Sequence, residues 1–149
     1  MKYFIIAGEA SGDLHGANLV KELRAVDDNA EIQCWGGDKM SKAGAYLLKD
    51  YRDLAIMGFW EVLIKLRSIF TNLRICTEQV ISFKPDIVIL IDYPGFNLRI
   101  ARRLKKYNTR IYYYISPKVW AWKSSRIKKI KEYIDRMYVI FPFEPEFFS

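Results

Sequence analysis

The sequence predicts an α/β protein built on a doubly wound, mainly parallel sheet. Short runs rich in β-branched and aromatic residues alternate with longer helical stretches along the whole chain. One of these runs, Ile87–Ile91, is apolar at every position, as expected of a strand that is buried on both faces of a parallel sheet. The length of 149 residues and the hydrophobic content of 51% fit a single domain with one core.

The chain opens with a βαβ unit. Its parts are a strand at Tyr3–Ala7, a helix from about Leu14 to Ala25 and a strand at Glu31–Trp35. A long helical pattern then runs from about Phe59 to Phe83. The segment Lys84-Pro85-Asp86 ends this helix, because proline has no N–H to continue the hydrogen-bond ladder.

The second half of the chain, which starts with the strand Ile87–Ile91, repeats this alternation. We expect four further elements: a basic helix at Leu98–Tyr107, a strand at Arg110–Ile115, a second basic helix at Ser124–Tyr133 and a last strand at Met137–Phe141. Ligands of open parallel sheets bind beyond the carboxyl ends of the strands. The residues that follow each strand are therefore the candidates for chemistry.

Positive charge is concentrated in one part of the sequence. The chain has 24 Lys and Arg against 17 Asp and Glu, and twelve of the basic residues lie between Arg99 and Lys131, where there is no acidic residue. Such a stretch attracts polyanions, whether nucleic acid, lipid headgroups or phosphorylated substrates. The alternative is that these residues are ordinary solvated helix faces.

The composition argues against a metal site, an export signal and a membrane span. Cys34 and Cys76 lie in apolar stretches without CxxC spacing, so they are expected to be reduced, buried thiols. For the only histidine, His15, we expect a packed or hydrogen-bonded role. The apolar run Tyr3–Ala7 is too short for a signal peptide, and no stretch reaches the ~18–20 apolar residues of a spanning helix. Any membrane contact must be peripheral.

A glycine-rich segment follows the first strand. Its backbone N–H groups and the helix N-terminus suit a phosphate or sugar hydroxyl, which makes substrate-binding candidates of Gly8, Glu9, Ser11, Gly12 and Asp13. The glycines have G-x3-G-x3-G spacing and the second strand is not followed by an acidic residue, so NAD binding is not expected. Alternatively, the glycines make a tight turn and Ser11 or Asp13 caps the helix.

Asp92 follows the central strand, where a carboxylate has low-dielectric neighbours and faces the ligand crevice. It is a candidate general base, unless it caps the turn Tyr93–Gly95. The segment Ser116–Trp122 follows the next strand and contains two tryptophans, which line a sugar pocket or cover the core.

The stretch Met57–Phe70 is more apolar than one core-facing helix stripe requires. Helical spacing puts Leu63, Leu66, Phe70 and Leu73 on one face. Further large apolar side chains in this stretch lie outside that face. Either a second surface covers them or they enter a lipid interface. The candidates for membrane or acyl-chain contact are Phe59, Trp60, Leu63, Ile64 and Phe70.

A set of motifs spread over the whole chain strongly resembles the lipid-A-disaccharide synthase family. In the order of that family the chain carries Ala7-Gly-Glu-Ala-Ser-Gly-Asp13, Met57-Gly58 with Glu61-Val62, Lys84-Pro-Asp86, Ile91-Asp92 with Pro94 and Phe96-Asn97, Ser116-Pro117 with Val119-Trp-Ala-Trp122, and Phe141-Pro-Phe-Glu144. The glycine segment and the Ser-Pro-x-Val-Trp-Ala-Trp segment are the most distinctive of these motifs.

The resemblance implies the N-terminal, Rossmann-like half of a two-Rossmann-domain glycosyltransferase of GT-B type. Residues 1–149 are then the acceptor-side domain, and the nucleotide-sugar domain lies beyond Ser149, so the chain is expected to be inactive alone. The implied reaction joins UDP-2,3-diacylglucosamine to 2,3-diacylglucosamine 1-phosphate with inversion, giving the lipid A disaccharide precursor and UDP. The implied location is the cytoplasmic face of the inner membrane of a Gram-negative bacterium.

In this resemblance Asp92 matches the general base, and no cofactor or metal is implied. Asn97, Ser116 and Trp120 join the glycine segment as implied substrate contacts. Gly95 stands where the family pattern usually has a second aspartate, so a two-carboxylate mechanism is not expected here.

Three alternatives remain open beside this interpretation. One is another two-domain glycosyltransferase or a sugar-nucleotide epimerase, since a fold does not fix a substrate. The others are a non-catalytic membrane-binding domain and a nucleic-acid-binding module. The nucleic-acid reading is disfavoured because the side chains of Tyr112–Tyr114 alternate between the two faces of a strand and form no continuous stacking surface.

Overall fold

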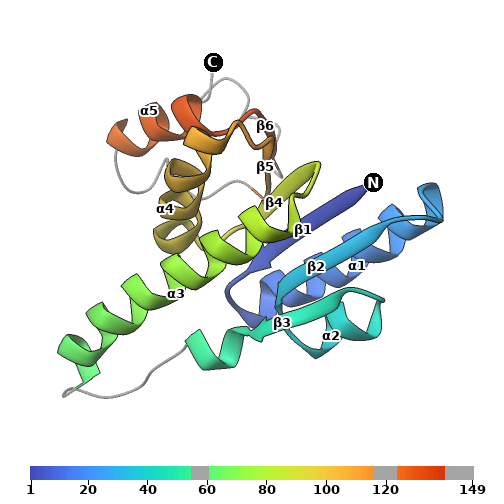
Figure 1. Ribbon diagram of the computed structural model, residues 1–149, viewed down its shortest axis with the longest axis horizontal. Helices are drawn as coiled ribbons and strands as arrows, with labels where there is room; N and C mark the ends of the chain where they lie inside the picture. The colour runs from blue at the N-terminus through green and yellow to red at the C-terminus, as the bar shows by residue number, and fades with distance from the viewer. Residues whose placement is uncertain (55–60, 116–123, 140–149) are drawn as a thin grey trace.

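The computed structural model describes residues 1–54, 61–115 and 124–139, and for residues 61–66, 124–126 and 129 it describes the backbone alone (Figure 1). Six parallel strands form one sheet in the order β3-β2-β1-β4-β5-β6. The strands are β1 (Lys2–Ala7), β2 (Glu31–Gly36), β3 (Tyr46–Asp50), β4 (Ile87–Ile91), β5 (Ile111–Tyr114) and β6 (Arg136–Tyr138). This is the doubly wound strand order of Rossmann-like folds, which confirms the predicted fold class.

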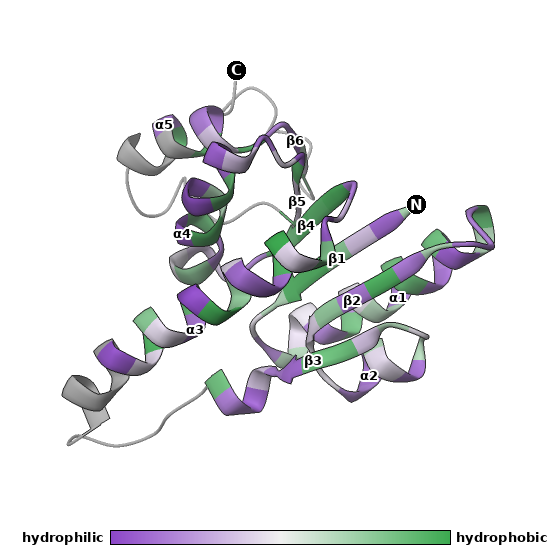
Figure 2. Cartoon of the chain, in the orientation of Figure 1, coloured by the Kyte–Doolittle hydropathy of each residue, from purple (hydrophilic) through white to green (hydrophobic). Residues whose placement is uncertain are grey.

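Helices cover the two faces of the sheet unequally. The helices are α1 (Ala10–Val26), α2 (Asp38–Lys42), α3 (Glu61–Phe83), α4 (Pro94–Leu104) and α5 (Ser124–Tyr133), with 3-10 turns at Tyr51–Leu54 and Lys105–Tyr107. One core cluster joins the sheet to α3, α4 and α5, and the other joins the opposite face to α1 and α2. The strand β4 is buried at all five positions because it contributes alternate side chains to both clusters. Figure 2 shows its hydrophobic colour beside the hydrophilic bands of α4.

Two elements were not expected from the sequence. The edge strand β3 has the sequence YLLKD and its residues are at most partly buried, so it lacks the apolar run that marks a buried strand. The helix α2 has only five residues, too few for a helical period to be recognised. Both follow β2 and complete the α1-covered half of the sheet.

The boundaries of two helices differ from the prediction. Helix α1 begins at Ala10 instead of Leu14, so that Gly12 lies inside it as well as Gly16. A side chain at Gly12 would press on Ala7 and one at Gly16 on Met40, which shows that these glycines allow α1 to approach its neighbours closely. Helix α4 begins at Pro94, a residue favoured in the first turn, instead of Leu98.

The expectations for the cysteines are confirmed. Cys34 and Cys76 are both free and fully buried. Burial raises the pKa of the Cys34 thiol to about 12 and raises that of Cys76 as well, so both thiols stay protonated near neutral pH. His15 is exposed on α1, so it has no packed role.

Candidate functional site

The site lies at the carboxyl edge of the sheet, where the helices change from one face to the other between β1 and β4. Strand register places Ala7 beside Ile91, and Ile91 beside Tyr114. The residues that follow these three positions therefore emerge level with one another. Two of these residues, Gly8 and Asp92, are among the candidates that the sequence placed after the strands.

Gly8 is in direct contact with the loop that follows β4. A Cβ added at Gly8 would overlap the ring of Tyr93, so only glycine fits under that ring. The Tyr93 ring in turn lies 6.1 Å from the ring of Phe96, and Phe96 stacks on Trp35 at 5.8 Å between ring centroids. The ends of β1 and β4 are thus packed together by aromatic side chains.

Glu9 and Ser11 form the polar surface of the glycine segment. Both are exposed at the start of α1, and the Ser11 hydroxyl donates to Glu9 Oε1 at 2.8 Å. Neither Ser11 nor Asp13 caps α1, since Glu9 holds the N-cap position and makes no side-chain cap bond. The expectation that one of them caps this helix is wrong.

Asp13 points away from this surface and is buried. Its Oδ1 accepts hydrogen bonds from the backbone N–H groups of Gly37 at 2.9 Å and Met40 at 3.1 Å, and its Oδ2 accepts one from Lys39 at 3.2 Å. Asp13 therefore caps α2, a helix other than its own.

Asp92 is half-buried and begins a turn of unusual backbone geometry. Asp92 and Tyr93 both have left-handed backbone conformations, with φ of 42° and 46°. Helix α4 has Tyr93 as its N-cap residue, and the Tyr93 side chain makes no cap hydrogen bond. Asp92 thus follows β4 at the carboxyl edge of the sheet, the edge at which ligands of such sheets bind.

Asn97 lies beneath this turn with no exposed surface. Its Nδ2 donates to the main-chain oxygens of Ile91 at 3.1 Å and Asp92 at 2.8 Å. Tyr113, from β5, donates its hydroxyl hydrogen bond to the same Asp92 oxygen. The resemblance implied a substrate contact for Asn97, and the sequence predicted no role for Tyr113. Hydrogen bonds to a main-chain oxygen five and 21 residues away leave no pattern in the sequence.

The remaining candidates lie at or beyond the edge of the described part. Ser116 and Trp120 fall outside the described residues, as do Phe59 and Trp60, and for Leu63 and Ile64 the backbone alone is described. Phe70 is described, and 62% of its surface is exposed although Leu73, one turn later, is buried. Ile69, the residue before Phe70, still packs against the core, so α3 stays on the core here and Phe70 points away from it.

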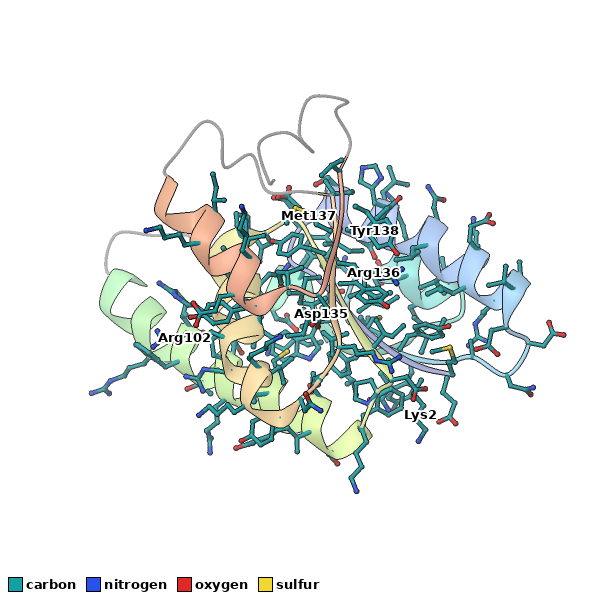
Figure 3. The ribbon with its side chains drawn as sticks, turned by 90° about the horizontal axis from the view of Figure 1, so that it is seen from above. Lys2, Arg102, Asp135, Arg136, Met137 and Tyr138 are labelled. Atoms are coloured by element: carbon teal, nitrogen blue, oxygen red, sulfur yellow. The ribbon has the colours of Figure 1, made fainter. Side chains whose placement is uncertain are left out.

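Basic side chains surround Phe70. A cavity of about 550 Å³ lies between α3 and α4, lined by Phe70, Leu73, Arg99, Arg102, Arg103 and Lys106. Figure 3 labels Arg102 on this side of the molecule. Over the described residues, no helix is long and apolar enough to cross a membrane. In the same part of the chain, no three His, Cys, Asp or Glu side chains gather as metal ligands.

Tyr112–Tyr114 do alternate between the two faces of β5. Tyr113 belongs to the cluster under α3 and α4, whereas Tyr112 and Tyr114 pack against the cluster under α1. They form no common stacking surface, as the sequence predicted.

Solved structures with similar folds include two UDP-GlcNAc 2-epimerases. The enzyme from Neisseria meningitidis, bound to UDP-GlcNAc, matches 93% of this chain and 40% of its own with a TM-score of 0.64 and 12% identity. A putative enzyme from Listeria monocytogenes gives a TM-score of 0.63 at 12% identity over 93% of this chain and 38% of its own. At this identity the likeness concerns the fold alone.

Sequence relatives are much closer. Lipid-A-disaccharide synthases from Geobacter sulfurreducens and Syntrophus aciditrophicus are 43% and 47% identical over 99% and 94% of this chain. The chain spans 38% and 37% of their lengths. A family model described as lipid-A-disaccharide synthetase matches residues 3–149. This chain therefore belongs to the lipid-A-disaccharide synthetase family.

Proposed function

We propose that the chain forms the acceptor-side wall of a glycosyltransferase that makes the lipid A disaccharide, with Asp92 as general base. The observation that carries the proposal is the position of Asp92. It follows the central strand of a Rossmann-like sheet, level with Gly8, in a chain that belongs to this family. A carboxylate at such an edge is placed to take a proton from a hydroxyl bound in the crevice.

The proposed reaction is a single displacement with inversion. The 6-hydroxyl oxygen of 2,3-diacylglucosamine 1-phosphate attacks the anomeric carbon of UDP-2,3-diacylglucosamine, and Asp92 takes the hydroxyl proton. The bond from the anomeric carbon to the diphosphate breaks, and UDP leaves with the electron pair. We assign the donor nucleotide to a second domain that follows residue 149, since the relatives are more than twice as long as this chain.

Other groups at the edge have supporting roles in this proposal. The exposed pair Glu9 and Ser11 would hydrogen-bond sugar hydroxyls, while Gly8 makes room for the Tyr93 ring and Gly12 lets α1 pack closely on β1. Ser116 and Trp120, outside the described residues, remain proposed sugar contacts. Asp13 acts through α2, whose start it caps.

We also propose that the face formed by α3 and α4 meets an anionic membrane on its cytoplasmic side. Phe70 is exposed beside a cavity lined by three arginines and Lys106, an arrangement that suits lipid acyl chains and phosphate headgroups together. Phe59, Trp60, Leu63 and Ile64 belong to the same proposal because they precede Phe70 in the sequence.

Replacement of Asp92 tests the proposed chemistry. In the complete protein that contains this chain, Asp92→Asn should lower the rate of disaccharide formation by about two to four orders of magnitude, the usual range for loss of a general base. The Michaelis constants should change little. Asp28→Asn, an exposed aspartate after α1, is the matched control and should keep the parent rate.

Three results would count against this proposal. A rate for Asp92→Asn within a few-fold of the parent would remove Asp92 as the base. Conversion of the UDP-sugar without any acceptor would favour an epimerase. Disaccharide formation by residues 1–149 alone would contradict the need for a second domain to position the donor.

A further inference from the structure

The turn that carries Asp92 has a backbone conformation that its residues do not favour. Asp92 and Tyr93 are consecutive left-handed residues, and neither is glycine. The Cβ of an ordinary residue crowds the following carbonyl in this conformation, so it persists only where the surroundings hold it. Three contacts hold this turn: the Asn97 side chain, the Tyr113 hydroxyl, and the packing of the Tyr93 ring over Gly8.

The first group is the Asn97 side chain. Both of its side-chain hydrogen bonds run from Nδ2 to main-chain oxygens of the strand end, those of Ile91 and Asp92. Its Oδ1 is buried and has no hydrogen-bond partner among the described residues. A buried oxygen without a hydrogen bond is costly. The Asn97 side chain therefore acts on the turn through its Nδ2 donor alone.

The second group is the Tyr113 hydroxyl, which donates to the same Asp92 oxygen from the neighbouring strand. Tyr113 is fully buried on the face that α3 and α4 cover. Two donors from different elements therefore converge on one carbonyl. Fixing this carbonyl fixes ψ of Asp92, and with it the direction in which the rest of the turn leaves the sheet.

The third contact comes from β1. The ring of Tyr93 lies directly over Gly8, where no Cβ fits, and its other neighbour is the ring of Phe96. The main-chain oxygen of Tyr93 accepts a hydrogen bond from the Asn97 N–H at 3.1 Å. Both residues of the turn are thus held, Asp92 through its carbonyl and Tyr93 through its ring and carbonyl.

We propose that Asn97 and Tyr113 are positioning residues, which hold the left-handed turn so that the Asp92 carboxylate is aligned with the reacting hydroxyl. The proposal rests on the proposed function of Asp92 as general base. Neither residue needs to touch substrate, since both are fully buried. Their effect on the reaction passes through the main chain of Asp92.

Tyr113→Phe is the direct test, because it removes the hydroxyl and keeps the buried ring. In the complete protein it should lower kcat about ten- to a hundredfold, the scale of a small misplacement of a catalytic group, and leave KM within about threefold. Tyr112→Phe is the control. This residue is the preceding one on β5, its side chain packs on the other face of the sheet, and kcat should be unchanged.

A double-mutant cycle separates positioning from a general structural effect. In the Asp92→Asn background, Tyr113→Phe should change kcat by less than about twofold, because no base remains to be positioned. An equal loss of kcat in both backgrounds, or no loss in the parent background, would overturn the inference. If Asp92→Asn itself leaves the rate unchanged, the proposed function fails, and this outcome is distinct from the other two.

Gly8→Ala disturbs the same turn from the opposite side. The new methyl group must displace the Tyr93 ring, so kcat should fall while the fold survives, as thermal unfolding can verify. Gly95→Ala is the matched control, because a Cβ at Gly95 meets no described atom within 4 Å. Equal activity of these two alanine variants would contradict the role of the Tyr93 contact.

Discussion

Asp13 shows how a residue in the expected site contributes from a distance. It lies in the glycine-rich segment that the sequence marks as a ligand loop, yet its carboxylate accepts three backbone N–H groups at the start of α2. These N–H groups have no partner within their own helix and carry its positive dipole end. The buried charge of Asp13 is thereby balanced without a basic side chain.

Substitution of Asp13 should lower stability in a graded way. Asp13→Ala removes the partner of two buried donors and one part-buried donor, and should reduce the free energy of unfolding by about 2–3 kcal/mol. Asp13→Asn keeps the shape but loses acceptor capacity and the charge, so its effect should be smaller. Urea unfolding followed by circular dichroism measures both. The exposed Asp28→Ala is the control, expected within about 0.5 kcal/mol of the parent. If Asp13→Ala is as stable as this control but binds substrate poorly, Asp13 is a ligand contact instead.

The sequence could indicate a candidate site but not the contacts that support its central turn. Gly8 and Asp92 follow apolar runs, and the convergence of parallel strand ends brings them together. The contacts of Asn97 and Tyr113 with the Asp92 carbonyl join residues five and 21 positions away, and nothing in periodicity or composition indicates main-chain partners. The same holds for Asp13, whose partners lie in a five-residue helix that has no recognisable pattern.

At the scale of elements, two aspartates connect neighbouring strands at the opposite, amino edge of the sheet. Asp86, before β4, accepts the backbone N–H of Lys2 at 2.7 Å, and Asp135, before β6, accepts that of Ile111 at 2.7 Å. Figure 3 labels Lys2 and Asp135. Each carboxylate pairs the first N–H of the adjacent strand and so fixes where that strand begins. The sequence pattern Lys84-Pro-Asp86 predicted the helix end but not this contact.

Helix α4 has side-chain charges that oppose its dipole at only one of its two ends. Arg102 and Arg103 lie in its last turn, where they oppose the negative end of the dipole, but its first turn has no acidic residue. Gly95, in that first turn, is exposed and has room for a side chain.

Gly95→Asp should therefore stabilise the protein by about 0.5–1.5 kcal/mol, from better helix propensity and from the charge at the helix N-terminus. Gly95→Asn has the same shape without the charge and isolates the propensity effect. Thermal unfolding at about 0.1 M and 1 M salt should show the Asp–Asn difference shrinking as salt screens the charge. An aspartate variant less stable than the asparagine variant at low salt would contradict the electrostatic part.

At the scale of the whole molecule, the two sides of the sheet differ in surface chemistry. The side of α3 and α4 carries a cavity with an arginine-rich rim beside the exposed Phe70. Across the sheet, a groove of about 350 Å³ beside α1 is lined mainly by tyrosine and aliphatic side chains from β1, β4, β5 and β6. A cavity between α1 and α2 has Lys21, Lys39 and Lys42 in its lining. The stretch from Arg99 to Lys131, however, holds twelve of the 24 basic residues and no acidic residue, and it includes most of α4 and α5. A negatively charged surface would meet the α3–α4 side first.

Binding of the complete protein to anionic vesicles should accordingly have two parts that respond differently to salt. Arg99→Gln with Arg103→Gln should weaken binding at 0.1 M salt by about 1 kcal/mol for each cation and have little effect at 1 M, where the Debye length falls from about 10 Å to about 3 Å. Phe70→Ser should weaken binding about tenfold at both salt concentrations, because apolar burial is not screened.

Two control variants lie on other elements. Lys21→Gln with Lys42→Gln, on α1 and α2, controls for net charge. Tyr46→Ser, at a residue that is 68% exposed on β3, controls for loss of an exposed aromatic side chain. Flotation with vesicles of phosphatidylglycerol and phosphatidylethanolamine measures all four variants. If the control variants lose as much binding as the α3–α4 variants, attraction is a property of overall charge, and this face is not the membrane-binding surface.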